Sequence, residues 1–148
     1  MKKIKTLIII ITLITSFALP ASANQTVEEI IKGRKAMFSE NYQNGKKISI
    51  LLKQKKIEEA KPLIKKISDN YIKLLDYFPD NTKEGFKTEA LLTIWEDKEN
   101  FNNLMSKASK NMIELASVIE DADDIKGTIG KLMWSNCKSC HNKYREEH

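Results

Sequence analysis

The chain of 148 residues has few of the residues that interrupt helices, with five glycines and three prolines. After residue 24, no segment alternates apolar and polar residues as a half-buried strand does. Apolar residues recur instead at steps of three and four, which indicates amphipathic helices. The length allows one domain with a real core but not comfortably two. The sequence therefore excludes a β-rich fold and favours a single all-helical domain.

Histidine is also scarce, since His141 and the terminal His148 are the two in the chain. The sequence contains no recognisable phosphate-binding loop and no pairing of a nucleophile with a general base. We therefore expect no conventional enzyme activity.

The first 23 residues have the order of features found in a secretory signal peptide. A basic stretch ends at Lys5, an almost wholly apolar run spans 7–19, and residues 21–23 form a small-residue cleavage signal. An uncleaved membrane anchor is the alternative, but the run is shorter than the roughly 20 residues that cross a bilayer. We expect cleavage near Ala23, export to the periplasm, and no stable membrane insertion of residues 24–148.

The net charge of +5 comes from 25 basic and 20 acidic side chains. Three of the basic side chains (Lys2, Lys3 and Lys5) belong to the leader, which carries no acid. Residues 24–148 thus have 22 basic and 20 acidic side chains, a net charge of +2. This small surplus predicts no nucleic-acid partner, and the lysines are better explained as a solvated surface.

Four helical segments are predicted after the leader, at 27–53, 57–77, about 95–119 and 125–145. Each presents an apolar stripe, and most of the connections between them are short. Together they predict an antiparallel four-helix bundle over residues 24–148.

Gly45 falls inside the first predicted helix, where glycine costs about 1 kcal/mol relative to alanine. Either a neighbouring helix or a flat cofactor approaches closely there, or the glycine lies on the surface without a special role.

The stretch Cys137-Lys138-Ser139-Cys140-His141 carries the strongest functional signal. Cys-x-x-Cys-His is the attachment signature of c-type haem. On a helix, residues three and four apart share a face, so both thiols and the imidazole project to one side. Two thioethers to the haem vinyl groups and an iron ligand from the same side are then possible. We predict one covalent haem c, with His141 as the iron ligand.

Three other interpretations of the cysteine pair are weaker. A thioredoxin-like redox pair is expected at the start of a helix in a βαβ context, which this sequence lacks. A zinc site needs four ligands, and His141 and His148 are the histidines on offer. Two cysteines in an exported protein predict a disulfide by default, but one between Cys137 and Cys140 closes almost no loop and stabilises little.

With this motif near its C-terminus, the sequence resembles the class II c-type cytochromes, the cytochrome c prime family. Residues 137–145, including the Tyr-Arg pair after the motif, are similar to the end of that family's sequences. Residues 94–97 followed by Phe101 resemble its third-helix signature, and residues 31–36 resemble its first-helix arginine segment. The resemblance extends over nearly all of the chain after the leader.

The resemblance implies an antiparallel four-helix bundle that holds the haem near one end and often forms a homodimer. It places Arg34 near a haem propionate and Arg145 beside the imidazole of His141. Arg34 is the better candidate, because a charge on an apolar stripe requires a buried anionic partner. The alternative for both arginines is a solvated position on the surface.

The resemblance also makes the residue on the other side of the iron decisive. A methionine there implies six-coordinate iron and an electron carrier, whereas an apolar residue implies five-coordinate iron that binds nitric oxide or carbon monoxide. The position corresponds to Phe38, one turn after Arg34, which favours the gas-binding alternative. A helix rotated by about 100° presents Met37 instead, which favours simple electron transfer with redox partner proteins.

Overall fold

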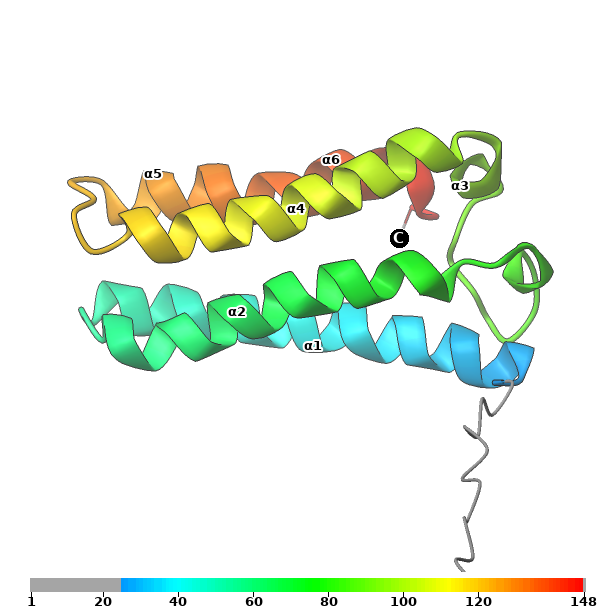
Figure 1. The fold of residues 1–148 in the computed structure, drawn as a ribbon, viewed down its shortest axis with the longest axis horizontal. Coiled ribbons are helices and arrows are strands. Elements are labelled where there is room, and N and C mark those ends of the chain that lie inside the picture. The colour runs from blue at the N-terminus through cyan, green and yellow to red at the C-terminus, as the bar shows by residue number, and fades with distance from the viewer. Residues whose placement is uncertain (1–24, 148) are drawn as a thin grey trace, which may run out of the picture.

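The structure is a computed structural model that describes residues 25–147, so the predicted leader lies outside the described residues. Its long helices form a four-helix bundle (Figure 1), which confirms the predicted all-α fold. The elements of the bundle are α1 (Val27–Lys53), α2 (Ile57–Leu74), α4 (Lys98–Val118) and a last segment made of α5 (Ile125–Ile129), η3 (Gly130–Trp134) and α6 (Ser135–Tyr144).

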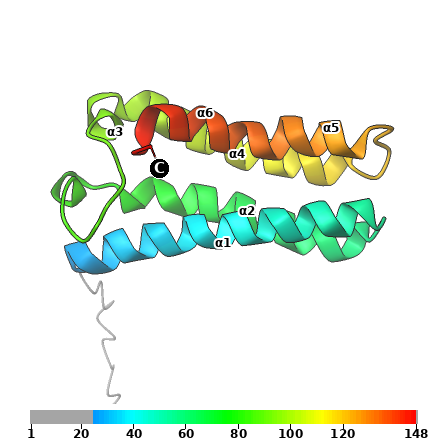
Figure 2. The ribbon, with the colours of Figure 1, turned by 180° about the vertical axis from the view of Figure 1, so that it is seen from behind.

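The bundle has two layers, with α1 beside α2 and α4 beside the last segment (Figures 1 and 2). The apolar stripes of the four segments meet in a continuous core. Full burial of one such large apolar side chain stabilises the fold by about 1.5–3 kcal/mol. Buried members of this core include Ile48, Leu52, Ile64, Leu74, Phe101, Met112, Leu115, Ile129 and Leu132.

Helix α1 has the bounds that the apolar pattern predicts, and its start is fixed by a capping box. The backbone N–H of Glu29 donates to Thr26 Oγ1 (3.2 Å), and the backbone N–H of Thr26 donates to the Glu29 carboxylate (2.7 Å). These bonds satisfy donors that a helix start otherwise leaves without partners.

Gly45 is buried, so the surface alternative is wrong. A Cβ atom at this position meets the indole of Trp134 at 3.1 Å and Met133 Sδ at 3.5 Å. The glycine therefore allows α1 to approach the last segment closely, which offsets its cost in helix stability.

Two predicted helices are interrupted in the structure. The third is split at Asp97, whose backbone is non-helical, into α3 (Thr93–Glu96) and α4. The fourth contains the π-helical segment η3, which directly precedes α6. Because a π-helical turn takes up extra residues, it changes the direction in which later side chains point, and such turns are frequent at functional sites.

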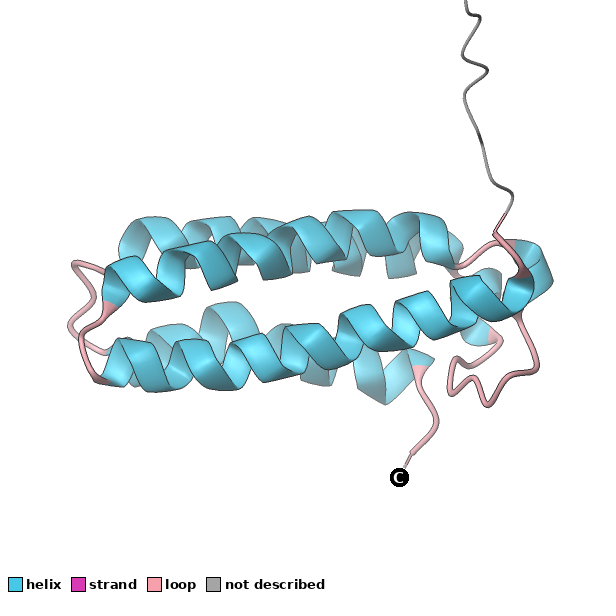
Figure 3. Cartoon of the chain, turned by 90° about the horizontal axis from the view of Figure 1, so that it is seen from below, coloured by secondary structure: helices cyan, strands magenta, loops and turns pink. Residues whose placement is uncertain are grey.

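The long connection between α2 and α4 lies at the same end of the bundle as the C-terminus (Figure 3). It contains the short helices η1 (Leu75–Tyr77) and η2 (Asp80–Thr82). Its residues 89–91 pair with the chain end: Leu91 N–H donates to the Tyr144 carbonyl (3.1 Å), and Glu146 N–H donates to the Glu89 carbonyl (2.9 Å). The connection is thereby held against the last turn of α6.

Within residues 25–147, no helix is long and apolar enough to cross a membrane.

Candidate cofactor site

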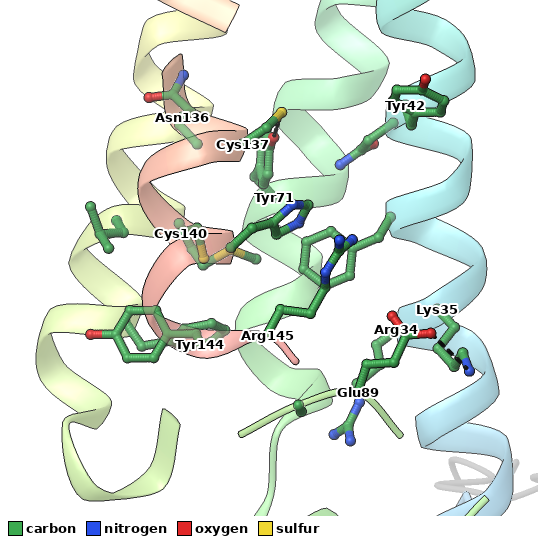
Figure 4. Close-up of a pocket in the computed structure, with 18 of the residues that line it drawn as sticks. Arg34, Lys35, Tyr42, Tyr71, Glu89, Asn136, Cys137, Cys140, Tyr144 and Arg145 are labelled. Atoms are coloured by element: carbon green, nitrogen blue, oxygen red, sulfur yellow. Dashed lines mark hydrogen bonds and ion pairs between the residues drawn. The ribbon is translucent and has the colours of Figure 1, made fainter. Parts of the chain in front are cut away.

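A cavity of about 640 Å³ lies inside the bundle near this end, within the size range of small-molecule and cofactor sites. All four helical segments and the α2–α4 connection contribute to its lining. Figure 4 shows α6 on one side of the cavity and α1 on the other, with Tyr71 of α2 between them. We call the α6 side the attachment wall and the α1–α2 side the facing wall.

The attachment wall carries Cys137, Cys140 and His141, which all line the cavity as their spacing predicts. Both cysteines are free and half-buried. Burial raises the pKa of both thiols, that of Cys140 to about 11. A reactive redox pair requires a lowered thiol pKa, so these values disfavour the thioredoxin-like interpretation. Within residues 25–147, no three His, Cys, Asp or Glu side chains are arranged to hold a metal ion, which disfavours zinc.

The imidazole of His141 is half-buried, and burial lowers its pKa below the usual value. The positive charge of Arg145 lowers the pKa further, while Glu89 raises it. These effects favour the neutral ring, which is the form that binds a metal ion. Arg145 itself lines the cavity, and its buried Nε atom makes no hydrogen bond with the described residues.

On the facing wall, Phe38 lines the cavity, whereas Met37 is not among the lining residues. Both side chains are partly buried and pack against the core. Adjacent residues on a helix differ by about 100° in direction, and of these two it is Phe38 that reaches the cavity. The roles of the two residues towards the iron stay predictions.

Arg34 also lines the cavity from α1, but it is 2% exposed, so the solvated-surface alternative is wrong for it. Its guanidinium donates to Thr82 Oγ1 (3.0 Å), the Thr82 carbonyl (2.9 Å), Thr88 Oγ1 (2.6 Å) and the Tyr77 carbonyl (3.2 Å). All four acceptors are neutral, and burial lowers the pKa of Arg34 to about 10. These bonds fasten the α2–α4 connection to α1, and the contact of Arg34 with a haem propionate stays a prediction.

Two polar residues of the facing wall were not identified from the sequence. Tyr71 was assigned to the core, which its burial confirms, and its hydroxyl also lies at the cavity, 4.0 Å from Cys137 Sγ. Burial strongly raises its pKa, so the phenol stays neutral. Asn41 lines the cavity from α1 and is also buried. The sequence could have identified Asn41, because it is a polar residue three positions after Phe38 and therefore on the same face of the helix.

These residues fit a covalent haem. The cavity is lined mainly by apolar side chains, both thiols and the imidazole reach it from one helix, and buried N–H donors of Asn41 and Arg145 have no partners among the described residues. A helical bundle with this arrangement defines a c-type cytochrome with its attachment site in the last helix.

Comparison with known proteins identifies the family. The profile described as Cytochrome C' matches residues 29–145, so the chain belongs to the cytochrome c' family. The cytochrome c' of Rhodopseudomonas palustris (strain ATCC BAA-98 / CGA009) is 34% identical over 120 residues, which cover 79% of this chain and 82% of that protein.

Two solved structures show the same fold. Cytochrome c' from Rhodopseudomonas palustris is 32% identical with a TM-score of 0.74, and the match covers 83% of this chain and 98% of that one. Cytochrome c' from Shewanella frigidimarina is 25% identical with a TM-score of 0.70, over 83% and 98% of the two chains. The protein is therefore a haem c protein that carries electrons.

Proposed function

We propose that this protein is a periplasmic cytochrome with five-coordinate haem iron that binds nitric oxide or carbon monoxide and also transfers single electrons. Cys137 and Cys140 would hold the haem, and His141 would be the one protein ligand of its iron. The observation that carries the proposal is the presence of Phe38, and not Met37, in the lining of the cavity. A phenyl ring cannot coordinate iron, so Phe38 would leave the sixth position open to a gas.

The rest of the facing wall supports an open position. Its lining residues from α1 and α2 include no histidine or methionine among those that the structure describes. Met105 and Met133 also line the cavity, but they come from α4 and η3, in the same layer as His141 (Figure 2). A protein ligand opposite His141 would have to come from the facing wall. Tyr71 is on that wall, but its raised pKa disfavours the phenolate that binds iron.

The haem supplies an iron that cycles between the ferric and ferrous states and can bind a gas. The protein supplies the environment. Burial and the nearby charge of Arg145 lower the pKa of His141 and so favour its neutral ring, against a smaller opposing effect of Glu89. The ring of Phe38, on the facing wall, leaves room at the iron only for small ligands. Arg34 fixes the α2–α4 connection, which closes the end of the cavity.

The proposal is tested by absorption spectra of the haem-loaded protein, ferric and ferrous, with and without carbon monoxide. A broad high-spin ferrous spectrum that changes promptly with carbon monoxide is expected. The Met37→Ala variant is the matched test, and its spectra are expected to equal those of the wild type. Sharp low-spin bands that do not change with carbon monoxide would contradict the proposal. If Met37→Ala also abolishes these bands, Met37 is the sixth ligand and the protein is a simple electron carrier.

A further inference from the structure

Asn41 combines burial with an unused hydrogen-bond donor at the cavity. The residue is 7% exposed and lines the cavity, yet its Nδ2 atom is buried without a hydrogen-bond partner among the described residues. A buried N–H donor without an acceptor is unfavourable, because it has lost its hydrogen bonds to water. An acceptor that binds in the cavity can remove this cost.

The orientation of the Asn41 amide is set by a chain of hydrogen bonds that begins at the surface. Asn70 on α2 donates through Nδ2 both to the Glu40 carboxylate (2.8 Å) and to Asn41 Oδ1 (2.8 Å). An ionised carboxylate only accepts, so Asn70 has to present its NH₂ group to Glu40. The same NH₂ group then requires the oxygen of Asn41, which leaves the NH₂ group of Asn41 as the free donor.

Asn41 also belongs to the facing wall, across the cavity from the attachment wall. It is on the same face of α1 as Phe38, three residues further along, and this helix is opposite the attachment wall (Figure 4). We propose that Asn41 donates a hydrogen bond from Nδ2 to a diatomic ligand on the haem iron, with Asn70 and Glu40 as positioning residues. The inference rests on the proposed gas-binding function and adds a polar contact beside the apolar Phe38.

The test compares haem-loaded wild type with Asn41→Leu, a change of similar size that removes the donor. Asn70 keeps Glu40 as its acceptor, so the variant is expected to fold. A donor near the ligand oxygen draws electron density from iron into the ligand and weakens its C–O bond. The C–O stretch of the ferrous carbon monoxide complex should therefore move to higher wavenumber in Asn41→Leu. Nitric oxide should dissociate roughly two- to tenfold faster, the effect of losing one net hydrogen bond.

Glu40→Gln provides a second variant at an exposed position, and Glu28→Gln on the same helix is its matched control. Glutamine can accept or donate, so Glu40→Gln loosens the orientation of both amides and should shift the C–O stretch in the same direction, while Glu28→Gln should leave it unchanged. If Asn41→Leu binds carbon monoxide with an unchanged stretch and only melts earlier, the inference is wrong and Asn41 is structural.

If Asn41→Leu fails to fold, an unchanged stretch in Glu40→Gln overturns the inference. If the wild type binds no carbon monoxide, the proposed function itself fails, and the inference with it. The two failures are distinguishable, because only the second removes the spectral response of the wild type.

Discussion

The two walls of the cavity are built in different ways. The attachment wall takes its two thiols and its imidazole from one short stretch of α6, Cys137 to His141. The facing wall takes Phe38 and Asn41 from α1 and Tyr71 from α2, and its end is closed by a connection that Arg34 holds in place. One wall is a contiguous motif, whereas the other exists only after the helices have packed.

This difference separates two tasks. The attachment wall determines which cofactor is bound, because thioether formation needs two thiols at a fixed spacing. The facing wall determines what the iron can do, because the chemistry of a haem depends on the polarity and access of the pocket opposite its protein ligand. Changes in the two walls should therefore have different consequences.

The largest effect is expected from the attachment wall. Replacing both Cys137 and Cys140 by serine should abolish covalent haem, since no thiol remains to form a thioether. Haem staining after denaturing electrophoresis measures this. Ser139→Ala, between the two cysteines, is the control and should retain the haem. Covalent haem in the double variant would contradict the assignment.

Arg34→Met should cost roughly 2–5 kcal/mol of unfolding free energy, because it leaves buried oxygens of the α2–α4 connection without donors. Chemical denaturation of the haem-loaded protein measures the loss. Lys32→Met on the same helix, where the lysine is exposed and paired with Glu28, should change stability little. An equal, small effect of both substitutions is the result that counts against a structural role for Arg34.

Phe38→Ala should change the facing wall and leave the attachment wall intact. Truncating the partly buried ring should cost about 1–3 kcal/mol, less than a fully buried phenylalanine. Carbon monoxide should bind faster, as flash photolysis can measure, because the ring no longer restricts the facing wall. Met37→Ala is the control at the adjacent residue. If carbon monoxide binds faster to Met37→Ala but not to Phe38→Ala, then Met37, and not Phe38, faces the iron.

The smallest effect concerns Asp97, which supports the attachment wall from the break between α3 and α4. Its carboxylate accepts hydrogen bonds from Lys143 and from the Tyr144 hydroxyl (2.9 Å), and these bonds lower its pKa. A carboxylate with a lowered pKa in the folded state stabilises the fold fully at pH values above the ordinary carboxyl pKa of about 3.9. This contribution is lost as the pH falls through the lowered pKa.

Asp97→Asn should therefore lower the melting temperature at pH 7, and the difference from wild type should vanish as the pH falls well below 3.9. Thermal unfolding followed by circular dichroism over this range measures it. A difference that stays constant with pH would show that the charge of Asp97 is not what stabilises the fold.

How much could be predicted from the sequence also differs between the walls. The bounds of α1 and the attachment residues follow from local signals: an apolar period, a capping box and a contiguous motif. The split at Asp97 and the π-helical segment η3 do not, because the apolar period of the sequence runs through both of them.

The same limit applies to single residues. Arg34 stood out as a charge on an apolar stripe, but its partners Thr82 and Thr88 lie in a connection without a repeating pattern. The roles of Asn41 and Tyr71 depend on which way packed helices turn their side chains. The choice between Met37 and Phe38 depends on a helix rotation that no local signal determines.

The proposed function requires that His141 be the one protein ligand of the iron and that Phe38 face an open sixth position. Iron-edge X-ray absorption of the ferrous haem-loaded protein tests this requirement, because nitrogen and sulfur neighbours scatter differently. Nitrogen neighbours alone are expected, with the coordination number of five-coordinate haem. A sulfur atom at bonding distance from the iron, lost in Met37→Ala, would contradict it.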